Sequence, residues 1–535
     1  MIKLKLPILF TFFISSISFA QNDRFQMGEI ISPSEDNDRL YKDLSVITSR
    51  FGVWLTDRVT VLGKIEGEIY MHIYLKKEPY SDKKTINGLL SFDEEMNLTG
   101  MYSLNEIIDS RKCKFRDVLI FGGEVRAFCS TTDKNFTDDY AALYTITLDR
   151  KTRKFSEAKK MYDIPKLGSG HDYSTVASAN NKFLAVIGDI GTPGTRCHYS
   201  VQLYNENMEL IYESIGVEYP LDDDHIFKKA KVSNTGIVYL FMEEREVLRV
   251  FDQGDEYLDL LWIDMKGQSH HEHFEFTGMA LGKFDVIEQN GKDLFYVSYF
   301  EEENITICGI KLIDLSEDKV ILNHSFKPEW IEPVLKRQMS AVPIDKVEAR
   351  DGFHATQAAN MLELLQYVNY DNYHVLVLGK STNCISGGGG RGPTDDYAPD
   401  KAAQRGDLVF LKFGENGDLV SKRKIERTIV ITAPSYEVLK VKENSISILY
   451  EHSPLLEEED KSKAGMKKLK DNTFLYLSVL DLNSFSLSKP EMIEIKDEEN
   501  ILYWPWLKNC YIENEAVYTL CAAAKKKERL VKIEL

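Results

Sequence analysis

A short strand–turn–strand phrase recurs along this chain, and this repetition constrains its fold more than any other feature. Each copy consists of two strands of alternating apolar and polar residues around an Asp, Asn or Gly turn, which is the pattern of a β-hairpin. The seven copies span residues 89–98, 143–155, 200–210, 260–269, 309–321, 408–420 and 476–487. Such regular self-similarity predicts a repeat architecture in which each unit packs against the next.

A second kind of hairpin, with a Gly- or Asn-rich turn, alternates with the first. Its eight copies span residues 59–75, 117–129, 175–188, 228–242, 284–300, 364–379, 436–451 and 510–521. One hairpin of each kind makes a repeat of four antiparallel strands. Between the equivalent turns at Gly67 and Asn514 the mean repeat is about 64 residues, which is the scale of a repeat architecture.

Repeats of four antiparallel strands make this chain resemble the β-propeller proteins as a fold class. The resemblance covers nearly all of residues 21–535 and identifies no particular family, because neither the GH…WD pattern of WD40 repeats nor the double glycine of kelch repeats recurs at regular spacing. We therefore expect an all-β, single-domain propeller of about eight four-stranded blades, with seven blades as the alternative. A repeat protein of this kind can absorb the whole length in one body.

The eighth repeat lacks one strand, because only the segment 529–535 follows its first hairpin. Propellers commonly complete the last blade with a strand from the opposite end of the chain. The N-terminal segments 27–32 and 51–55 have the composition of strands. We expect one of them to close the ring, which removes two exposed sheet edges.

Successive strands of such a ring run in opposite directions, so each connection falls on one of its two faces according to whether it follows an odd or an even strand of the repeat. We call this rule strand parity. The turn inside each hairpin lies on one face, whereas the links between hairpins and between blades lie on the other. The three longest insertions, 327–357, 380–406 and 452–472, are all links of the second sort. Because binding residues concentrate on loops held by a rigid scaffold, this long-loop face is where we expect a ligand.

The first residues predict export. Lys3 and Lys5 precede the apolar segment 6–17, and a small-x-small exit at 18–20 follows, as in a secretory signal peptide. No later segment is apolar enough over a sufficient length to cross a bilayer as a helix. We expect cleavage of residues 1–20 and a mature protein in the periplasm, outside the cell or on its surface.

The net charge limits the classes of partner that we expect, and the cysteine count bears on which disulfides could form. The net charge of −18 argues against nucleic acid as a partner. Seven cysteines are an odd number for an exported chain. Two pairs could form disulfides across hairpins, Cys113 with Cys129 and Cys510 with Cys521, if the register allows it. Otherwise these cysteines are buried thiols.

Two groups of side chains on the long-loop face are candidate ligand-binding residues. The first lies on adjacent links of one repeat, and the second lies in a Gly-rich insertion. They are His171, Asp172, Arg196 and His198 in the first group, and Arg391, Asp395, Asp396 and Tyr397 in the second. We assign no catalytic residue and no metal ligand.

Weaker motifs favour surface loops over chemistry. The GxGxxG match within 386–392 is followed by prolines and not by the helix that a dinucleotide site needs. His271 and His273 share a face of a strand, but no second ligand cluster accompanies them. The oxygen-bearing residues of 133–139 lack the Gly of a calcium loop. We therefore expect no cofactor, and calcium remains an alternative.

No GxSxG or cysteine-protease motif occurs in the chain. The sequence thus favours an exported, non-enzymatic propeller that binds a protein, a peptide or a glycan through its long-loop face. The alternative is a secreted propeller enzyme acting on glycans or peptides, whose acid–base residues gather near the ring axis.

Overall fold

A computed structural model describes most of the expected strands. The described residues are 24–29, 59–78, 81–104, 107–108, 111–131, 140–165, 173–189, 198–218, 225–244, 257–275, 279–301, 304–317, 319–325, 361–383, 403–427, 437–452, 474–505, 507, 510–523 and 527–535.

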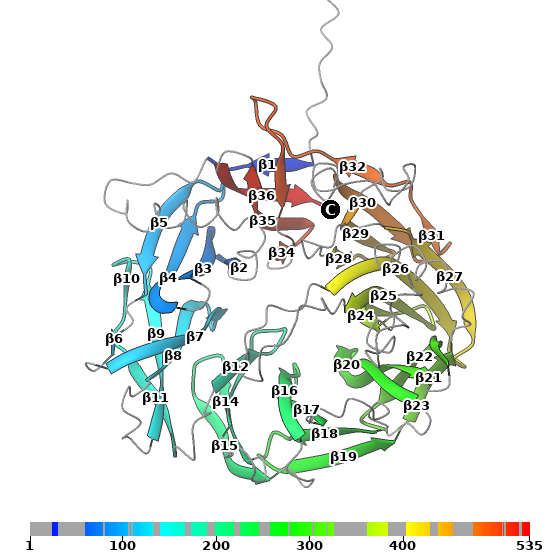
Figure 1. Ribbon diagram of the computed structural model, residues 1–535, viewed down its shortest axis with the longest axis horizontal. Helices are drawn as coiled ribbons and strands as arrows, with labels where there is room; N and C mark the ends of the chain where they lie inside the picture. Colours follow the sequence, from blue (N-terminus) through cyan, green and yellow to red (C-terminus); the bar gives the residue numbers. More distant parts are fainter. Residues whose placement is uncertain are drawn as a thin grey trace, which may run out of the picture.

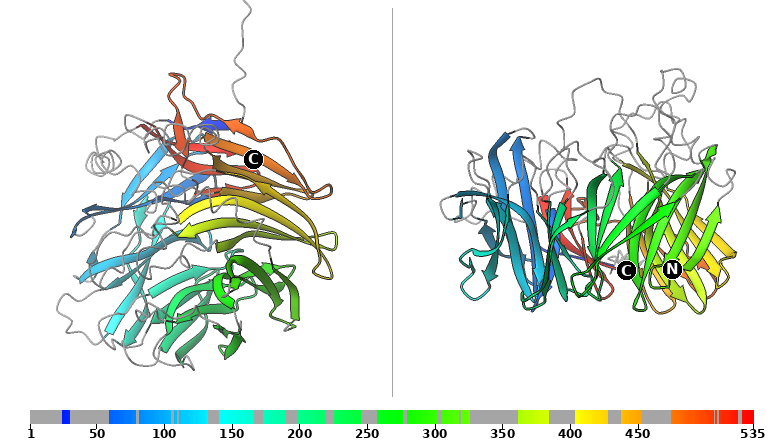
Figure 2. Two further views of the ribbon diagram at one scale, coloured as in Figure 1. Left: turned by 45° about the vertical axis from the view of Figure 1, so that its right-hand side comes forward. Right: turned by 90° about the horizontal axis from the view of Figure 1, so that it is seen from below.

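These residues form eight antiparallel sheets arranged in a ring, a β-propeller, and we number the sheets blades 1 to 8 in chain order (Figure 1). In blades 1, 3, 4, 5 and 6 the first strand lies toward the ring centre and the last lies at the rim (Figure 1). Viewed from the side, the strands run between the two faces of the ring (Figure 2). The prediction of eight four-stranded blades is confirmed.

Blades 1 to 4 each consist of strands that pair mainly in chain order. Blade 1 comprises β2 (Val59–Ile65), β3 (Glu68–Glu78), β4 (Ser81–Phe92) and β5 (Leu98–Ser103). Blade 2 comprises β6 (Ile107–Ile108), β7 (Arg111–Phe121), β8 (Glu124–Thr131), β9 (Tyr140–Asp149), β10 (Lys154–Phe155) and β11 (Lys159–Pro165). Blade 3 comprises β12 (Tyr173–Ala177), β13 (Phe183–Asp189), β14 (His198–Asn205) and β15 (Leu210–Glu218), and blade 4 comprises β16 (His225–Val232), β17 (Val238–Glu244), β18 (Tyr257–Ile263) and β19 (Ser269–Glu275).

Blades 5 to 7 follow the same order, and blade 8 combines both ends of the chain. Blade 5 comprises β20 (Met279–Gln289), β21 (Lys292–Glu301), β22 (Asn304–Asp314) and β23 (Lys319–Ser325), and blade 6 comprises β24 (Met361–Tyr370), β25 (Tyr373–Asn383), β26 (Ala403–Gly414) and β27 (Leu419–Ile425). Blade 7 comprises β28 (Glu437–Val441), β29 (Ser445–His452), β30 (Phe474–Asp481), β31 (Ser486–Leu487) and β32 (Glu491–Ile493). Blade 8 comprises β33 (Tyr503–Pro505), β34 (Tyr511–Glu513), β35 (Ala516–Ala523), β36 (Lys527–Glu534) and β1 (Phe25–Met27).

The N-terminal strand closes the ring as expected. Strand β1 pairs antiparallel with β36, and Gln26 lies opposite Lys532. The closing strand ends at Met27, where the first of the two expected segments begins, and the second segment, 51–55, lies outside the described residues. Arg24 also pairs with Glu491 of blade 7 at 3.0 Å, so the closing segment contacts two blades.

The acidic or amide residue of each repeated phrase caps its own turn. In blade 4, Asp264 Oδ1 accepts hydrogen bonds from the backbone N–H groups of Lys266 and Gln268, both at 2.9 Å. Asx side chains favour turns through this local bond. Equivalent side-chain oxygens accept backbone N–H groups at Asp93, Asp149, Asn205, Asp314 and Asp481. In blade 6 Gly414 holds this position, and Asn416 within the turn accepts the N–H of Asp418 instead. The recurrence of the phrase therefore has a local physical cause.

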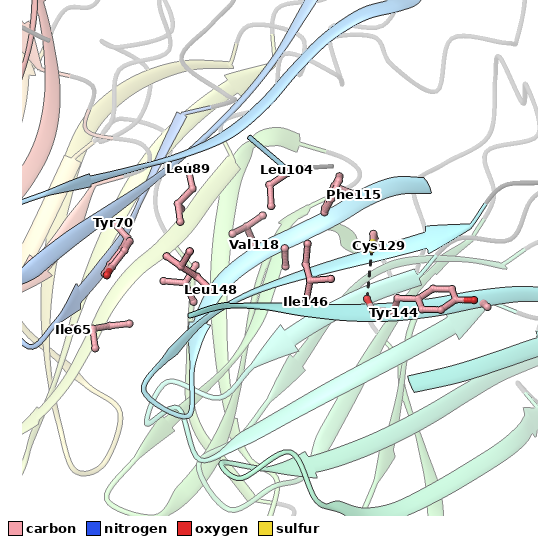
Figure 3. Packing of buried hydrophobic residues seen from close by; sticks show 13 residues of the cluster. Ile65, Tyr70, Leu89, Leu104, Phe115, Val118, Cys129, Tyr144, Ile146 and Leu148 are labelled. Carbon is pink, nitrogen blue, oxygen red and sulfur yellow. Dashed lines mark hydrogen bonds between the residues drawn. The ribbon is translucent and has the colours of Figure 1, made fainter. Parts of the chain in front are cut away.

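The hydrophobic core of the described residues is a ring of eight clusters, each lying between two successive blades. The cluster between blades 1 and 2 brings together Ile65, Tyr70 and Leu89 with Val118 and Ile146 (Figure 3). Burial of such apolar faces is the main favourable term in folding. Each blade is therefore stabilised by its neighbours on both sides.

Neither of the two possible disulfides forms, because the register does not place the two cysteines of either pair opposite one another. Cys113 lies opposite Thr131, two residues beyond Cys129, and the Cys129 thiol donates to the carbonyl of Tyr144 at 3.8 Å (Figure 3). Cys521 lies opposite Pro505, and both Cys510 and Cys521 are thiols.

The described residues contain no helix long and apolar enough to cross a membrane.

Candidate functional site

Most of the residues predicted to bind a ligand lie outside the described residues. These are His171, Asp172, Arg196, Arg391, Asp395, Asp396 and Tyr397. His198 is described as the first residue of β14, where its backbone lies opposite Glu218. The segments 386–392 and 133–139 also lie outside the described residues. The prediction of a site on the long-loop face therefore remains a prediction.

The described residues form a different candidate site, a pocket of about 380 Å³ on the inner strands of blades 4, 5 and 6. Strands β16, β20 and β24 supply most of its wall, and they lie side by side toward the ring centre (Figure 1). The pocket-lining ends of β16 and β20 are those that lead into their tight hairpin turns. By strand parity, the pocket extends toward the face opposite the long loops.

Polar contacts between successive blades form the wall of this pocket, and the two partners of each contact are separated by the same number of sequence positions. Lys231 Nζ lies 3.3 Å from Asp285 Oδ1, and the hydroxyl of Tyr239 donates to Asp293 Oδ2 at 2.6 Å. The two partners of each pair are 54 positions apart, which is the offset between blades 4 and 5 here. Equivalent positions of neighbouring blades therefore bond to one another.

The same offset links three successive blades at the turns. The backbone N–H of Asn234 donates to Glu288 Oε2 at 2.5 Å. The Asn234 side chain in turn accepts the backbone N–H of Asn180 at 2.8 Å. Because these bonds join separate sheets, they hold the pocket wall in a fixed arrangement, as preorganised sites require.

The two aspartates in the pocket have different electrostatic environments. Burial raises the pKa of Asp293, the Tyr239 hydroxyl opposes this rise, and the charge of Glu288 adds to it. Its second oxygen, Oδ1, is buried and has no hydrogen-bond donor among the described residues. Asp285 Oδ1, by contrast, accepts the Val286 N–H at 2.8 Å in addition to its contact with Lys231.

Blade 6 supplies a less charged wall. Leu364, Leu365 and Tyr367 line the pocket together with Gln366, next to a register shift in β24 between Leu364 and Gln366. Burial raises the pKa of Tyr367 to about 12, and its hydroxyl bonds His374 Nδ1 at 2.7 Å. This side of the pocket therefore stays uncharged at neutral pH.

A second cluster of buried charges lies between blades 6 and 7, at strand ends on the long-loop side. Arg427 and Glu437 form an ion pair of 2.8 Å, and both side chains are almost fully buried. Burial raises the pKa of nearby Glu451 to about 8, the Arg427 charge opposes this rise, and Glu437 adds to it. Glu451 also lines a cavity of about 20 Å³, which is room for a single water molecule.

The two histidines expected to share a face of a strand lie on β19. His271 Nε2 and His273 Nδ1 both contact Oδ1 of buried Asp259, at 2.9 and 2.8 Å. In the part of the chain that the structure describes, no group of three or more His, Cys, Asp and Glu side chains is arranged to hold a metal ion.

The pocket residues were missed by sequence reasoning, although one signal could have found them. Aligning the hairpins of blades 4 and 5 at an offset of 54 places a cation opposite an anion at Lys231 and Asp285, and a phenol opposite a carboxyl at Tyr239 and Asp293. Contacts between equivalent positions of adjacent repeats are natural in a ring.

No protein-family model matches this chain, and no curated protein sequence is similar to it. Solved structures resemble it only in fold. Prolyl oligopeptidase B from Galerina marginata has a TM-score of 0.36 and 9% identity over 92% of this chain, which spans 59% of that protein.

The β-propeller domain of the Trilobed protease from Pyrococcus furiosus has a TM-score of 0.33 and 9% identity, covering 79% of this chain and 93% of that one. An oligogalacturonate lyase in complex with manganese has a TM-score of 0.33 and 8% identity, covering 89% and 90%. Because the identities and TM-scores are this low, none of these similarities assigns a function to a residue of this chain.

Proposed function

We propose that this chain is an exported, non-enzymatic propeller that binds a protein, peptide or glycan partner. The pocket on the inner strands of blades 4 to 6 carries the proposal, since its volume of about 380 Å³ lies in the range of ligand sites. Polar groups that can orient a ligand line it beside apolar ones, as is typical of binding pockets. The long-loop face supplies a second contact surface.

The pairing of the polar groups supports binding over turnover. Lys231, Tyr239 and Asn234 each bond the next blade, so these side chains and backbone groups stabilise the wall itself. A rigid, polar wall favours recognition because little side-chain entropy is lost when a ligand binds.

One observation favours an enzyme acting on glycans or peptides as the second candidate. Asp293 has a raised pKa, whereas Asp285 contacts the Lys231 ammonium group and accepts a backbone N–H. Two carboxyl groups in unlike environments can act as general acid and general base.

Peptide and glycan arrays probed with labelled mature protein test the binding proposal. We expect a restricted set of ligands whose signal falls at least tenfold when Gln366→Trp fills the pocket. Shortening the loop 384–402 measures the contribution of the long-loop face, and Val420→Trp on the exposed rim serves as the matched control. A restricted ligand set that neither the filled pocket nor the shortened loop alters would contradict the proposal.

Turnover assays on the same ligands separate the two candidates. Cleavage of an array ligand that disappears in both Asp285→Asn and Asp293→Asn would establish the enzyme and overturn the non-enzymatic proposal. Retention of the intact ligand over many hours at micromolar protein supports the binding protein.

A further inference from the structure

We infer that the pocket of blades 4 to 6 binds an organic cation, a primary ammonium or guanidinium group carried on a short aliphatic chain. This deepens the proposed function and rests on the same pocket. Such a group is presented by the side chains of lysine and arginine in a peptide, and also by free diamines.

The charge of the pocket supports this ligand class. Among its described lining residues, three carboxyl groups, those of Asp285, Glu288 and Asp293, stand against one ammonium group, that of Lys231. With all of them ionised, the wall carries two uncompensated negative charges. The net charge of −18 for the whole chain adds a field that draws cations toward the protein.

Hydrogen bonding supports it independently of charge. Within the part of the chain that the structure describes, Asp293 Oδ1 is buried and has no hydrogen-bond donor, whereas Oδ2 accepts the Tyr239 hydroxyl. An unsatisfied buried acceptor of this kind carries a desolvation cost. An ammonium or guanidinium donor that enters the pocket and reaches this oxygen removes that cost and forms a strong, charge-assisted bond.

The remaining wall suits the aliphatic part of the ligand. Val286 and Ile287 of β20 and Leu364 and Leu365 of β24 line the pocket on either side. Apolar surface beside a charged end matches a chain of methylene groups that terminates in a cation, because burial of each methylene group favours binding.

Cation binding is coupled to a proton. Burial and the charge of Glu288 raise the pKa of Asp293 in the unliganded protein, so this carboxyl holds a proton to higher pH than an ordinary aspartate. A cation nearby favours the carboxylate. Binding therefore releases protons at mildly acid pH, and the affinity rises with pH until Asp293 is ionised in the free protein as well.

Isothermal titration calorimetry of the mature protein with 1,5-diaminopentane and with agmatine tests the inference. The neutral probe 1,5-pentanediol and the anionic probe glutarate match the chain length without the cation. We expect both cations to bind at least tenfold more tightly than either control. Titration in two buffers of different ionisation enthalpy, between pH 4 and 7, will show net proton release.

Variants assign the effect to the pocket. Asp293→Asn is expected to weaken cation binding at least tenfold and to abolish the proton release, and Glu288→Gln is expected to weaken binding while retaining the release. Asp149→Asn removes one charge from a remote turn, keeps an oxygen that can cap that turn, and is expected to change neither.

Equal affinity for diaminopentane and pentanediol, or cation binding that Asp293→Asn and Glu288→Gln leave unchanged, would overturn the inference. If an uncharged array ligand is lost on filling the pocket while neither cation binds, the cation inference fails and the proposed binding function stands. If filling the pocket and shortening the loop leave every array ligand bound, the proposed function fails separately.

Discussion

Ionisation of the Glu451 carboxyl couples the stability of the fold to pH. Burial raises the pKa of its carboxyl from 4.5 to about 8. Between these values the folded protein holds a proton that the unfolded chain has released. Stability therefore falls as pH rises through this window, by about 1.4 kcal/mol per pH unit.

Substituting Glu451→Gln is expected to remove this dependence, because the amide stays neutral and nearly isosteric. Urea unfolding at pH 5, 6.5 and 8 measures it. The variant should match the parent protein near pH 5 and exceed it increasingly toward pH 8. Parallel stability profiles for the two proteins would show that the Glu451 carboxyl is not buried in its neutral form.

At the scale of elements, the unit of stability is the interface between two blades. Leu240 of β17 is fully buried in the cluster between blades 3 and 4, together with Ile187 of β13 and Ile263 of β18. Its side chain thus contributes to two sheets at once. Cavities in such contacts are costly because the surrounding strands relax only partly.

Replacing Leu240 by Ala is expected to lower the free energy of unfolding by about 2–5 kcal/mol. Val420→Ala on the rim of blade 6, where the side chain is 56% exposed, should change it by less than about 0.5 kcal/mol. Denaturant unfolding followed by tryptophan fluorescence measures both. Equal effects of the two substitutions would contradict a core that lies between the blades.

The hairpins could be predicted from the sequence because their causes are local. Asp264 caps its own turn, and the strands beside it alternate in hydrophobicity. Register and inter-blade pairing could not be predicted. A register shift between Phe115 and Asp117 accompanies the pairing of Cys113 with Thr131, and the contact of Tyr239 with Asp293 depends on how two separate sheets pack.

At the scale of the whole molecule, closure joins the two ends of the chain. The carbonyl of Arg24 accepts the backbone N–H of Glu534 at 2.7 Å, and Gly28 donates to the Leu530 carbonyl at 3.0 Å. Without β1, strand β36 would present an unpaired edge, which promotes aggregation.

A variant that lacks residues 1–30, and with them β1, is expected to exchange the Glu534 amide at least tenfold faster and to aggregate at lower temperature. Hydrogen–deuterium exchange with mass spectrometry measures the first effect, and light scattering during heating measures the second. Arg24→Ala removes only a half-exposed ion pair, worth at most about 1 kcal/mol, and keeps β1. Unchanged exchange in the truncated chain would show that β1 does not close the ring.

The closed ring brings β16, β20 and β24 together, and the function that we propose depends on the pocket they form. A crystal structure of the mature protein with saturating 1,5-diaminopentane tests this most directly. We predict eight blades and an amine nitrogen within about 3.2 Å of a carboxylate oxygen of Asp285, Glu288 or Asp293. Crystals with an accessible pocket that holds no amine would contradict it.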